Sequence, residues 1–208
     1  MRKITTTLLF LIICTIVIAQ KTPIVYYDSV DNGRTYTSLQ EALQEPEKVY
    51  RLKLTKLANR DSLPEEIFQL TELRELTVKG CRLCVVNQNI DKLTKLEDLN
   101  LDKNKLLRLP ESIGNLKNLK YLCISRNIIE TLPNSISNLK QLTYIDAWDN
   151  PLYILPESIK ALQKSLQTLD LRQIPLTKTE YEAMQKLLPD TEILFTDICE
   201  CENRRDHN

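Results

Sequence analysis

Cysteines carry the most reactive side chains in this 208-residue sequence, so their spacing is the first clue to any chemistry. Cys81 and Cys84 form a C-x-x-C motif, and Cys199 and Cys201 form a second close pair near the end of the chain. Two such pairs together can supply the four thiolates of a zinc site, and one C-x-x-C motif can act in thiol–disulfide exchange. Either role requires the fold to place the sulfur atoms suitably.

Other forms of catalysis have little support in the sequence. The single histidine, His207, lies one residue from the end of the chain, so a packed triad of serine, histidine and carboxylate is not expected. The three glycines are isolated, which argues against a glycine-rich phosphate loop. Glu111 and Glu157 each follow a Leu-Pro pair, where a carboxylate stabilises the first turn of a helix. We therefore expect no enzyme activity, no cofactor and no metal.

A sequence repeat organises the elements that would position these side chains. Three consecutive units begin at Leu96, Leu119 and Leu142, so the period is 23, and their apolar residues coincide position by position. The units read LEDLNLDKNKLLRLPESIGNLKN, LKYLCISRNIIETLPNSISNLKQ and LTYIDAWDNPLYILPESIKALQK. A unit of this length cannot bury its apolar face alone, so the units are predicted to stack into a solenoid with one continuous core.

Each unit has two halves with different periodicity. The Leu-x-Leu alternation predicts a short strand with one buried face, and an asparagine follows it at Asn104, Asn127 and Asn150. The asparagine amide can satisfy backbone groups where the chain turns. The second half, LPxxIxxL, has helix-like spacing with proline at its entrance, which predicts a short helix or 3₁₀ turn.

The full pattern, LxxLxLxxNxLxxLPxxIxxLxx, resembles the leucine-rich repeat family, in the class found in exported bacterial proteins and in eukaryotic Ras-binding scaffold relatives. The resemblance covers roughly residues 49–188. It implies an α/β solenoid of about six repeats, with a curved parallel sheet on the concave side and short helices or 3₁₀ turns on the convex side. It also implies that the concave face binds a partner.

The segments that flank the repeats are predicted to cover the ends of the solenoid. Residues 20–48 include a capping box, Ser38-Leu39-Gln40-Glu41, that predicts a short helix. A second capping box, Thr177-Lys178-Thr179-Glu180, predicts a C-terminal capping helix through Leu188. Residues 189–208 are expected to add a closing strand at Ile193–Phe195 and a polar tail.

The solenoid separates the two cysteine pairs. Neighbouring strands lie about 4.8 Å apart, so the pairs should be roughly 20 Å apart, too far for a shared zinc ion. The C-x-x-C motif follows a repeat strand instead of opening a helix, which argues against a redox site. Cys81 is predicted to replace the turn asparagine, and Cys84 to pack or pair locally. A Cys81–Cys84 disulfide remains an alternative in an oxidising compartment.

Residues 1–19 have the features of an export signal. Arg2 and Lys3 precede an apolar run at residues 8–18, and Val17-Ile18-Ala19 is a suitable cleavage site. The alternatives are an uncleaved membrane anchor and a lipoprotein modified at Cys14. We expect the mature chain in the periplasm, at the cell surface or secreted, and not spanning a membrane.

Overall charge gives no indication of a charged partner. The sequence has 28 basic and 28 acidic residues, so its net charge attracts neither nucleic acid nor anionic membranes. The function expected is therefore a non-enzymatic protein-interaction module. The alternative is a structural or glycan-binding repeat protein of the cell envelope.

The predicted binding site lies on the concave face of the later repeats. Within each strand, the neighbours of the buried residues must point to this face. Aromatic residues gather there, bordered by charge, and Trp148 is the only tryptophan of the chain. The predicted partner-binding residues are Tyr121, Cys123, Tyr144, Asp146, Trp148, Asp170 and Arg172. Exposed aromatic side chains among charges are typical of binding hot spots, although these rings could instead pack on one another across the strands.

Overall fold

The computed structural model describes residues 33–57 and 61–196, which form a compact unit beginning at Gly33. The predicted export signal and the pair Cys199 and Cys201 lie outside the described residues.

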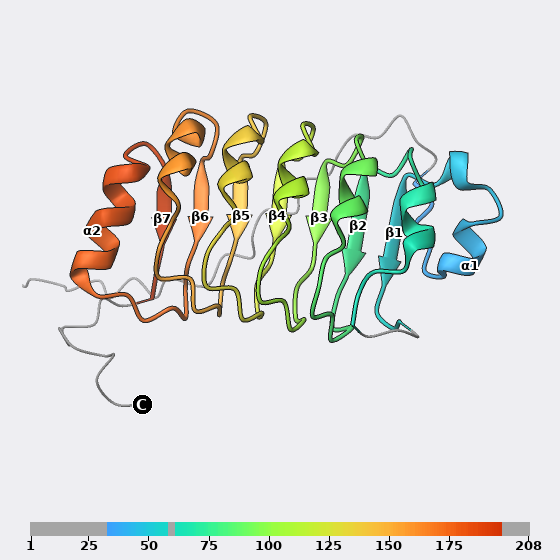
Figure 1. Ribbon diagram of the computed structural model, residues 1–208, viewed down its shortest axis with the longest axis horizontal. Coiled ribbons are helices and arrows are strands. Elements are labelled where there is room, and N and C mark those ends of the chain that lie inside the picture. Colours follow the sequence, from blue (N-terminus) through green and yellow to red (C-terminus); the bar gives the residue numbers. More distant parts are fainter. Residues whose placement is uncertain (1–32, 58–60, 197–208) are drawn as a thin grey trace, which may run out of the picture. The chain divides into compact units, whose positions relative to one another are not determined.

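Within the described residues, seven parallel strands form one open sheet, and their spatial order follows the sequence (Figure 1). The strands are β1 (Arg51–Leu54), β2 (Glu75–Val78), β3 (Asp98–Asn100), β4 (Tyr121–Cys123), β5 (Tyr144–Asp146), β6 (Thr168–Asp170) and β7 (Glu192–Leu194). The register pairs Leu99 with Leu122 and Leu122 with Ile145, so equivalent positions of successive repeats lie side by side. The predicted repeat and its strands are confirmed.

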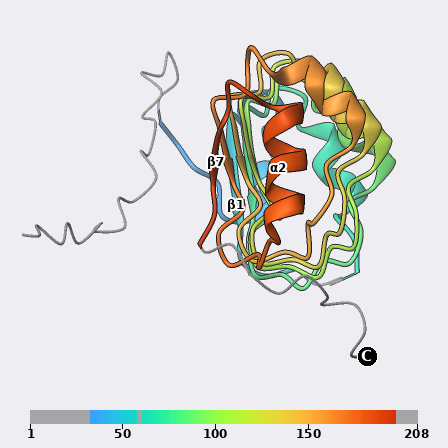
Figure 2. The ribbon, with the colours of Figure 1, turned by 90° about the vertical axis from the view of Figure 1, so that its left-hand side faces the viewer.

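Short helices lie on the opposite side of the unit from the sheet (Figure 2). Most are 3₁₀ helices, one for the second half of each repeat: η2 (Glu65–Gln69), η3 (Gln88–Lys92), η4 (Glu111–Asn115), η5 (Asn134–Asn138) and η6 (Glu157–Leu162). Proline immediately precedes η4, η5 and η6, at Pro110, Pro133 and Pro156. Its fixed φ suits the entrance of a helix, so the predicted role of Leu-Pro is confirmed.

The core runs without interruption between the sheet and the helices. Leu99, Leu122 and Ile145 at the strand centres are fully buried, as are Ile113 and Ile136 in the facing 3₁₀ helices. Stacking of the repeats therefore creates the apolar interior that a single unit lacks.

The turn asparagines form a ladder that joins neighbouring repeats. The Asn127 side-chain amide donates to the carbonyls of Leu101, Ile124 and Ser125 at 2.8–3.1 Å. Its Oδ1 accepts from the Leu106 N–H at 3.0 Å. Asn104 and Asn150 make the equivalent bonds, each to its own repeat and to the preceding one. Each asparagine thus satisfies backbone groups of two adjacent turns.

Cys81 occupies the asparagine position of the second repeat, as predicted. Its Sγ lies 3.7 Å from the Leu54 carbonyl and 3.6 Å from the Lys79 carbonyl, the directions in which an asparagine amide would donate. Cys84 points to the Arg82 carbonyl, and both cysteines are free thiols. The alternative of a disulfide between them does not apply to this structure.

Additional elements follow and precede the repeats. Helix α1 (Leu39–Ala42) is capped by Ser38, and a short 3₁₀ helix, η1 (Pro46–Lys48), leads into β1. Helix α2 (Lys178–Leu187) begins with the predicted capping box of Thr177 and Glu180 and buries Met184 and Leu187. The closing strand β7 begins one residue before the predicted Ile193–Phe195.

Candidate functional site

The predicted binding residues come from β4, β5, β6 and the turns that follow these strands. Tyr121 is the register partner of Tyr144, and Cys123 is the register partner of Asp146. All four side chains are half-buried on the outer face of the sheet, which we call the sheet face. The alternation predicted from the sequence therefore brings these residues together across two neighbouring repeats.

Cys123 and Asp146 contact each other directly. The Cys123 thiol donates to Asp146 Oδ2 at 3.4 Å and lies 3.2 Å from the Ser125 hydroxyl. Burial, with the Asp146 carboxylate as a second cause, raises the pKa of the Cys123 thiol to about 12. Because the thiolate is the nucleophile, a thiol held in this state is poorly suited to covalent chemistry.

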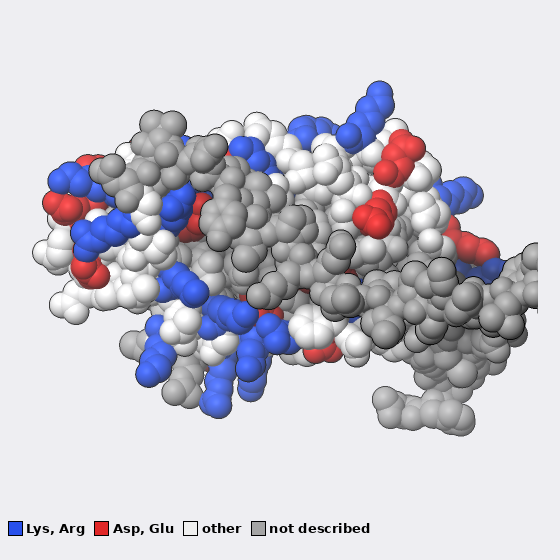
Figure 3. Space-filling view, turned by 180° about the vertical axis from the view of Figure 1, so that it is seen from behind, with Lys and Arg blue, Asp and Glu red and all other residues white. Residues whose placement is uncertain are grey.

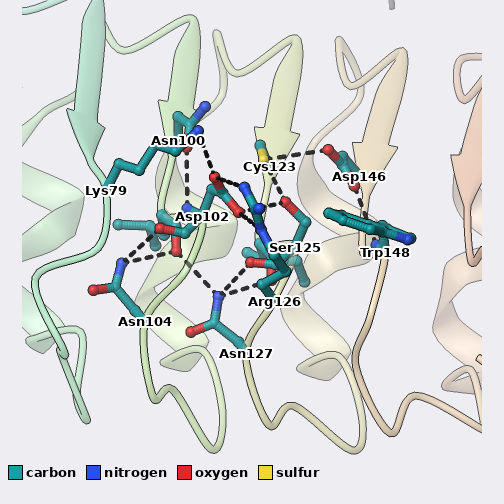
Figure 4. A network of polar contacts seen from close by, with 12 residues as sticks. Lys79, Asn100, Asp102, Asn104, Cys123, Ser125, Arg126, Asn127, Asp146 and Trp148 are labelled. Atoms are coloured by element: carbon teal, nitrogen blue, oxygen red, sulfur yellow. Dashed lines mark hydrogen bonds and ion pairs between the residues drawn. The ribbon is translucent and has the colours of Figure 1, made fainter. Parts of the chain in front are cut away.

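A buried carboxylate, Asp102, organises the turns next to this pair (Figure 4). Asp102 lies in the turn after β3 and is 3% exposed, although the strand alternation places it on the exposed face. Lys79 approaches its Oδ2 at 2.8 Å, Arg126 binds both carboxylate oxygens at 2.5–2.8 Å, and Ser125 donates at 3.0 Å. Burial would raise the pKa of Asp102, but the bonds from Arg126, Lys79 and Ser125 outweigh it and lower the pKa.

Trp148 is tied to this network through Arg126. The Arg126 guanidinium lies 5.0 Å from the Trp148 ring centroid, within the range of a cation–π contact. The Trp148 backbone N–H donates to Asp146 Oδ1 at 3.1 Å. A chain of contacts therefore runs from Lys79 through Asp102 and Arg126 to the half-buried indole, across four successive repeats.

Asp170 is on the sheet face as the register partner of Asp146, but it is not exposed there as predicted. It is 1% exposed and is covered by Arg172, whose guanidinium binds it at 2.6–3.2 Å. Its Oδ1 also accepts the Arg172 backbone N–H at 3.1 Å. The short carboxylate bends back to satisfy the turn, as Asp146 does in the preceding repeat. Arg172 is thus the accessible member of the pair, and Asp170 is removed from the predicted contact surface.

Tyr144 has an unusual environment. Its hydroxyl is buried and has no hydrogen-bond partner among the described residues. Burial, followed by the nearby Asp170 and Asp146 carboxylates, holds the pKa of Tyr144 well above its ordinary value. The hydroxyl therefore stays protonated at neutral pH.

Sequence reasoning missed Lys79 and Arg126 as parts of the site. Both act through Asp102, which follows Lys79 by one repeat and precedes Arg126 by about one repeat. Opposite charges in the turns of adjacent repeats were therefore the signal in the sequence that could have identified them.

In the described ranges, no group of three or more histidine, cysteine or acidic side chains could hold a metal ion. Of the helices described, none is long and apolar enough to cross a membrane.

Comparison with known proteins gives consistent results. The family model for the leucine-rich repeat region matches residues 85–192. No curated protein matches the chain. A solved leucine-rich repeat protein of Leptospira interrogans is 29% identical with a TM-score of 0.59, covering 80% of this chain and 49% of its own. The chain therefore spans about half the length of that relative.

A second solved structure supports the fold alone. Internalin C2 of Listeria monocytogenes is 20% identical with a TM-score of 0.57, covering 78% of this chain and 67% of its own.

Proposed function

Because the chain belongs to the leucine-rich repeat family, we propose that it is a non-enzymatic protein-interaction module that binds its partner on the sheet face. The observation that carries this proposal is the group of half-buried aromatic residues Tyr121, Tyr144 and Trp148 on neighbouring repeats. None of the three belongs to the leucine core, and the repeat pattern requires none of them. Aromatic residues next to arginine are the side chains most enriched in binding hot spots.

The polar network supports this site by holding it in place. Arg126 is fixed by two bonds to Asp102, so Trp148 packs against a guanidinium that is already ordered. A side chain that is ordered before binding loses less conformational entropy in the complex. Arg172 borders the group and is fixed in the same way by Asp170.

Site-specific photocrosslinking tests the location of the site. A photoreactive phenylalanine analogue at Tyr121 should crosslink to one protein of the envelope or culture fraction of the source cells. The same analogue at Lys53, on the sheet face of the first strand, is the matched control. In a pull-down from the same fraction without the analogue, the triple variant Tyr121→Ala, Tyr144→Ala and Trp148→Ala should no longer capture that protein, with its melting temperature nearly unchanged. Capture that survives the triple variant would place the site elsewhere and overturn the proposal.

The same experiment separates the protein-binding function from the alternative of a glycan-binding envelope protein. Capture that resists protease treatment of the fraction, but is lost after digestion of its glycans, would favour the alternative.

We further propose that the chain is exported after cleavage behind Ala19. The support is the sequence of residues 1–19, with its basic start and apolar run. Mass spectrometry of the mature protein should give Gln20 as its first residue. An intact Met1 or a lipid on Cys14 would contradict this proposal.

A further inference from the structure

A second surface lies on the segments that follow the strands, away from the aromatic group. The four exposed large aliphatic side chains of the described residues all belong to these segments: Val85, Leu107, Ile128 and Ile154, exposed by 46–62%. Exposed basic residues lie between them in the sequence. We call the resulting surface the loop edge, and it comprises Arg82, Val85, Lys103, Lys105, Leu107, Arg108, Ile128 and Ile154.

Backbone hydrogen bonds show that these residues are neighbours in space. Lys105 donates its N–H to the Leu83 carbonyl at 2.7 Å, and Ile128 donates to the Leu106 carbonyl at 3.0 Å. Residues 82, 105 and 128 therefore form one row across three repeats. In Figure 1 the segments after the strands run along the lower margin of the unit, and in Figure 3 lysine and arginine side chains gather at that margin.

The loop edge carries more basic than acidic side chains within the described residues. Arg82, Lys103, Lys105 and Arg108 form no ion pair there, whereas Lys79 and Arg126 are held by Asp102. Three exposed acidic residues belong to the same segments: Asp61, whose carbonyl accepts the Val85 N–H, and Glu130 and Asp149 of the later repeats. The net charge of zero thus conceals a basic region in the second and third repeats, which the expectation from composition overlooked.

Single aliphatic side chains separated by lysine and arginine distinguish this edge from the sheet face. Protein interfaces are enriched in aromatic residues and depleted in lysine, which describes the sheet face better. Lysine and arginine next to exposed aliphatic groups suit the boundary of a bilayer, where the cations meet anionic headgroups and the apolar groups reach the acyl chains. Neither nucleic acid nor a soluble acidic polymer offers an apolar layer to Leu107 and Ile128.

We propose that the loop edge docks the protein peripherally on an anionic lipid bilayer. In this arrangement the lipid phosphates are contacted by the basic side chains of Arg82, Lys103, Lys105 and Arg108. The headgroup layer is entered by the aliphatic side chains of Leu107 and Ile128. The sheet face lies apart from the edge and stays available to a protein partner. The two proposals rest on different residues and can fail independently.

Vesicle co-sedimentation tests the proposal with the chain from Gln20 onward, which contains the whole described unit and lacks the apolar run of the export signal. Vesicles that mix phosphatidylcholine with the anionic lipid phosphatidylglycerol should bind the protein, and vesicles of phosphatidylcholine alone should not. Each basic residue near an anionic surface increases binding by about fivefold. The triple variant Arg82→Gln, Lys103→Gln and Lys105→Gln should therefore bind about 100-fold more weakly. Glutamine occupies the turn position equivalent to Lys103 at Gln173, so the fold should tolerate these changes.

A control with the same change in charge keeps the result interpretable. The control is the triple variant Lys92→Gln, Lys164→Gln and Lys186→Gln, whose lysines are exposed and lie outside the loop edge. It should bind vesicles within twofold of the wild type. The variant Leu107→Ser and Ile128→Ser should lose several-fold in binding although its charge is unchanged. Equal losses in the two triple variants would overturn the proposal, as would no loss in the aliphatic variant. Binding to heparin or to an acidic protein, but not to anionic vesicles, would also overturn it.

Discussion

At the scale of single residues, the carboxylates near the sheet face fall into two electrostatic classes. Asp102 and Asp170 are covered by arginines, and hydrogen bonds from Arg126, Lys79 and Ser125 lower the pKa of Asp102. Asp98 and Asp146 have no cationic partner in the structure's described part, and burial raises the pKa of both. The lowered pKa of Asp102 means that its ionised form stabilises the folded state at neutral pH, whereas the raised pKa values of Asp98 and Asp146 mean that their ionised forms destabilise it there.

Asp98 gives the clearest pH dependence. Burial, with the Glu75 carboxylate as second cause, raises its pKa from 3.8 to about 6. The stabilisation from this group is complete below pH 4 and is lost as the pH rises through about 6. Asp98→Asn should therefore raise the free energy of unfolding by on the order of 1–3 kcal/mol at pH 7, with little effect at pH 4. Thermal unfolding from pH 4 to 8 measures this, with the exposed Glu130→Gln as control. A change in stability that is equal at every pH would contradict the assignment.

Tyr144 offers a prediction that separates folding from binding. A buried hydroxyl without a partner destabilises a fold by about 1–3 kcal/mol, so Tyr144→Phe should leave the melting temperature unchanged or raise it. Because the buried hydroxyl is out of reach of a partner, the same change should leave capture in the crosslinking assay unchanged. The measurements are a melting curve and the crosslinked fraction from position 121. A clear drop in melting temperature would show that the hydroxyl has a structural partner.

At the scale of elements, the turn after each strand is the most demanding part of the repeat. Lys103, Arg126 and Asp149 all adopt positive φ values of 53–59° at the same position of successive repeats. Each donates its N–H to a carbonyl of the next repeat, at 2.7–3.1 Å. The left-handed conformation costs about 1 kcal/mol for such residues, and this regular hydrogen bond offsets it. The turns are therefore held by contacts between repeats and not by local preference.

The asparagine ladder should consequently be as important as the apolar core. Asn127→Ala leaves the Leu106 N–H and three carbonyl groups without their side-chain partner and should cost roughly 1–3 kcal/mol. Leu122→Ala creates a cavity in the same repeat and should cost about 2–5 kcal/mol. Chemical denaturation measures both, with the exposed Glu130→Ala as the matched control at less than about 0.5 kcal/mol. Equal small effects in all three variants would refute the assigned register.

The repeat made most of these elements predictable, whereas the site was predictable only in part. Residues at equivalent positions of successive repeats have the same surroundings. The strands, the asparagine ladder and the replacement of an asparagine by Cys81 could therefore be predicted from the spacing of the repeats. Alternation along a strand indicates which face Asp102 and Asp170 approach, but not that a short carboxylate bends back into the turn. The pairing of Asp102 with Arg126 depends on contacts between repeats, which no periodicity within one repeat contains.

At the scale of the whole described unit, stability depends on contacts between neighbours along the stack. Each repeat contacts mainly the repeats on either side of it, so the two ends need other elements to cover their apolar surface. At the start, Tyr36 is buried and forms a parallel bridge with Leu52 of β1. At the other end, α2 lies across the stack in the view along it (Figure 2). The ends should therefore open more readily than the centre.

Native-state hydrogen exchange can test this picture through Met184, a core residue of α2 that is 1% exposed. Met184→Ala should remove about 2–5 kcal/mol of packing at the C-terminal end. Because coupling in a stacked array passes only between adjacent units, the amides of β6 and β7 should lose protection strongly, those of β5 less, and those of β2 and β3 least. Leu122→Ala in the centre is the comparison, and it should reduce protection on both sides of β4. A uniform loss of protection throughout the unit with Met184→Ala would instead mean that the described repeats unfold as a single cooperative block.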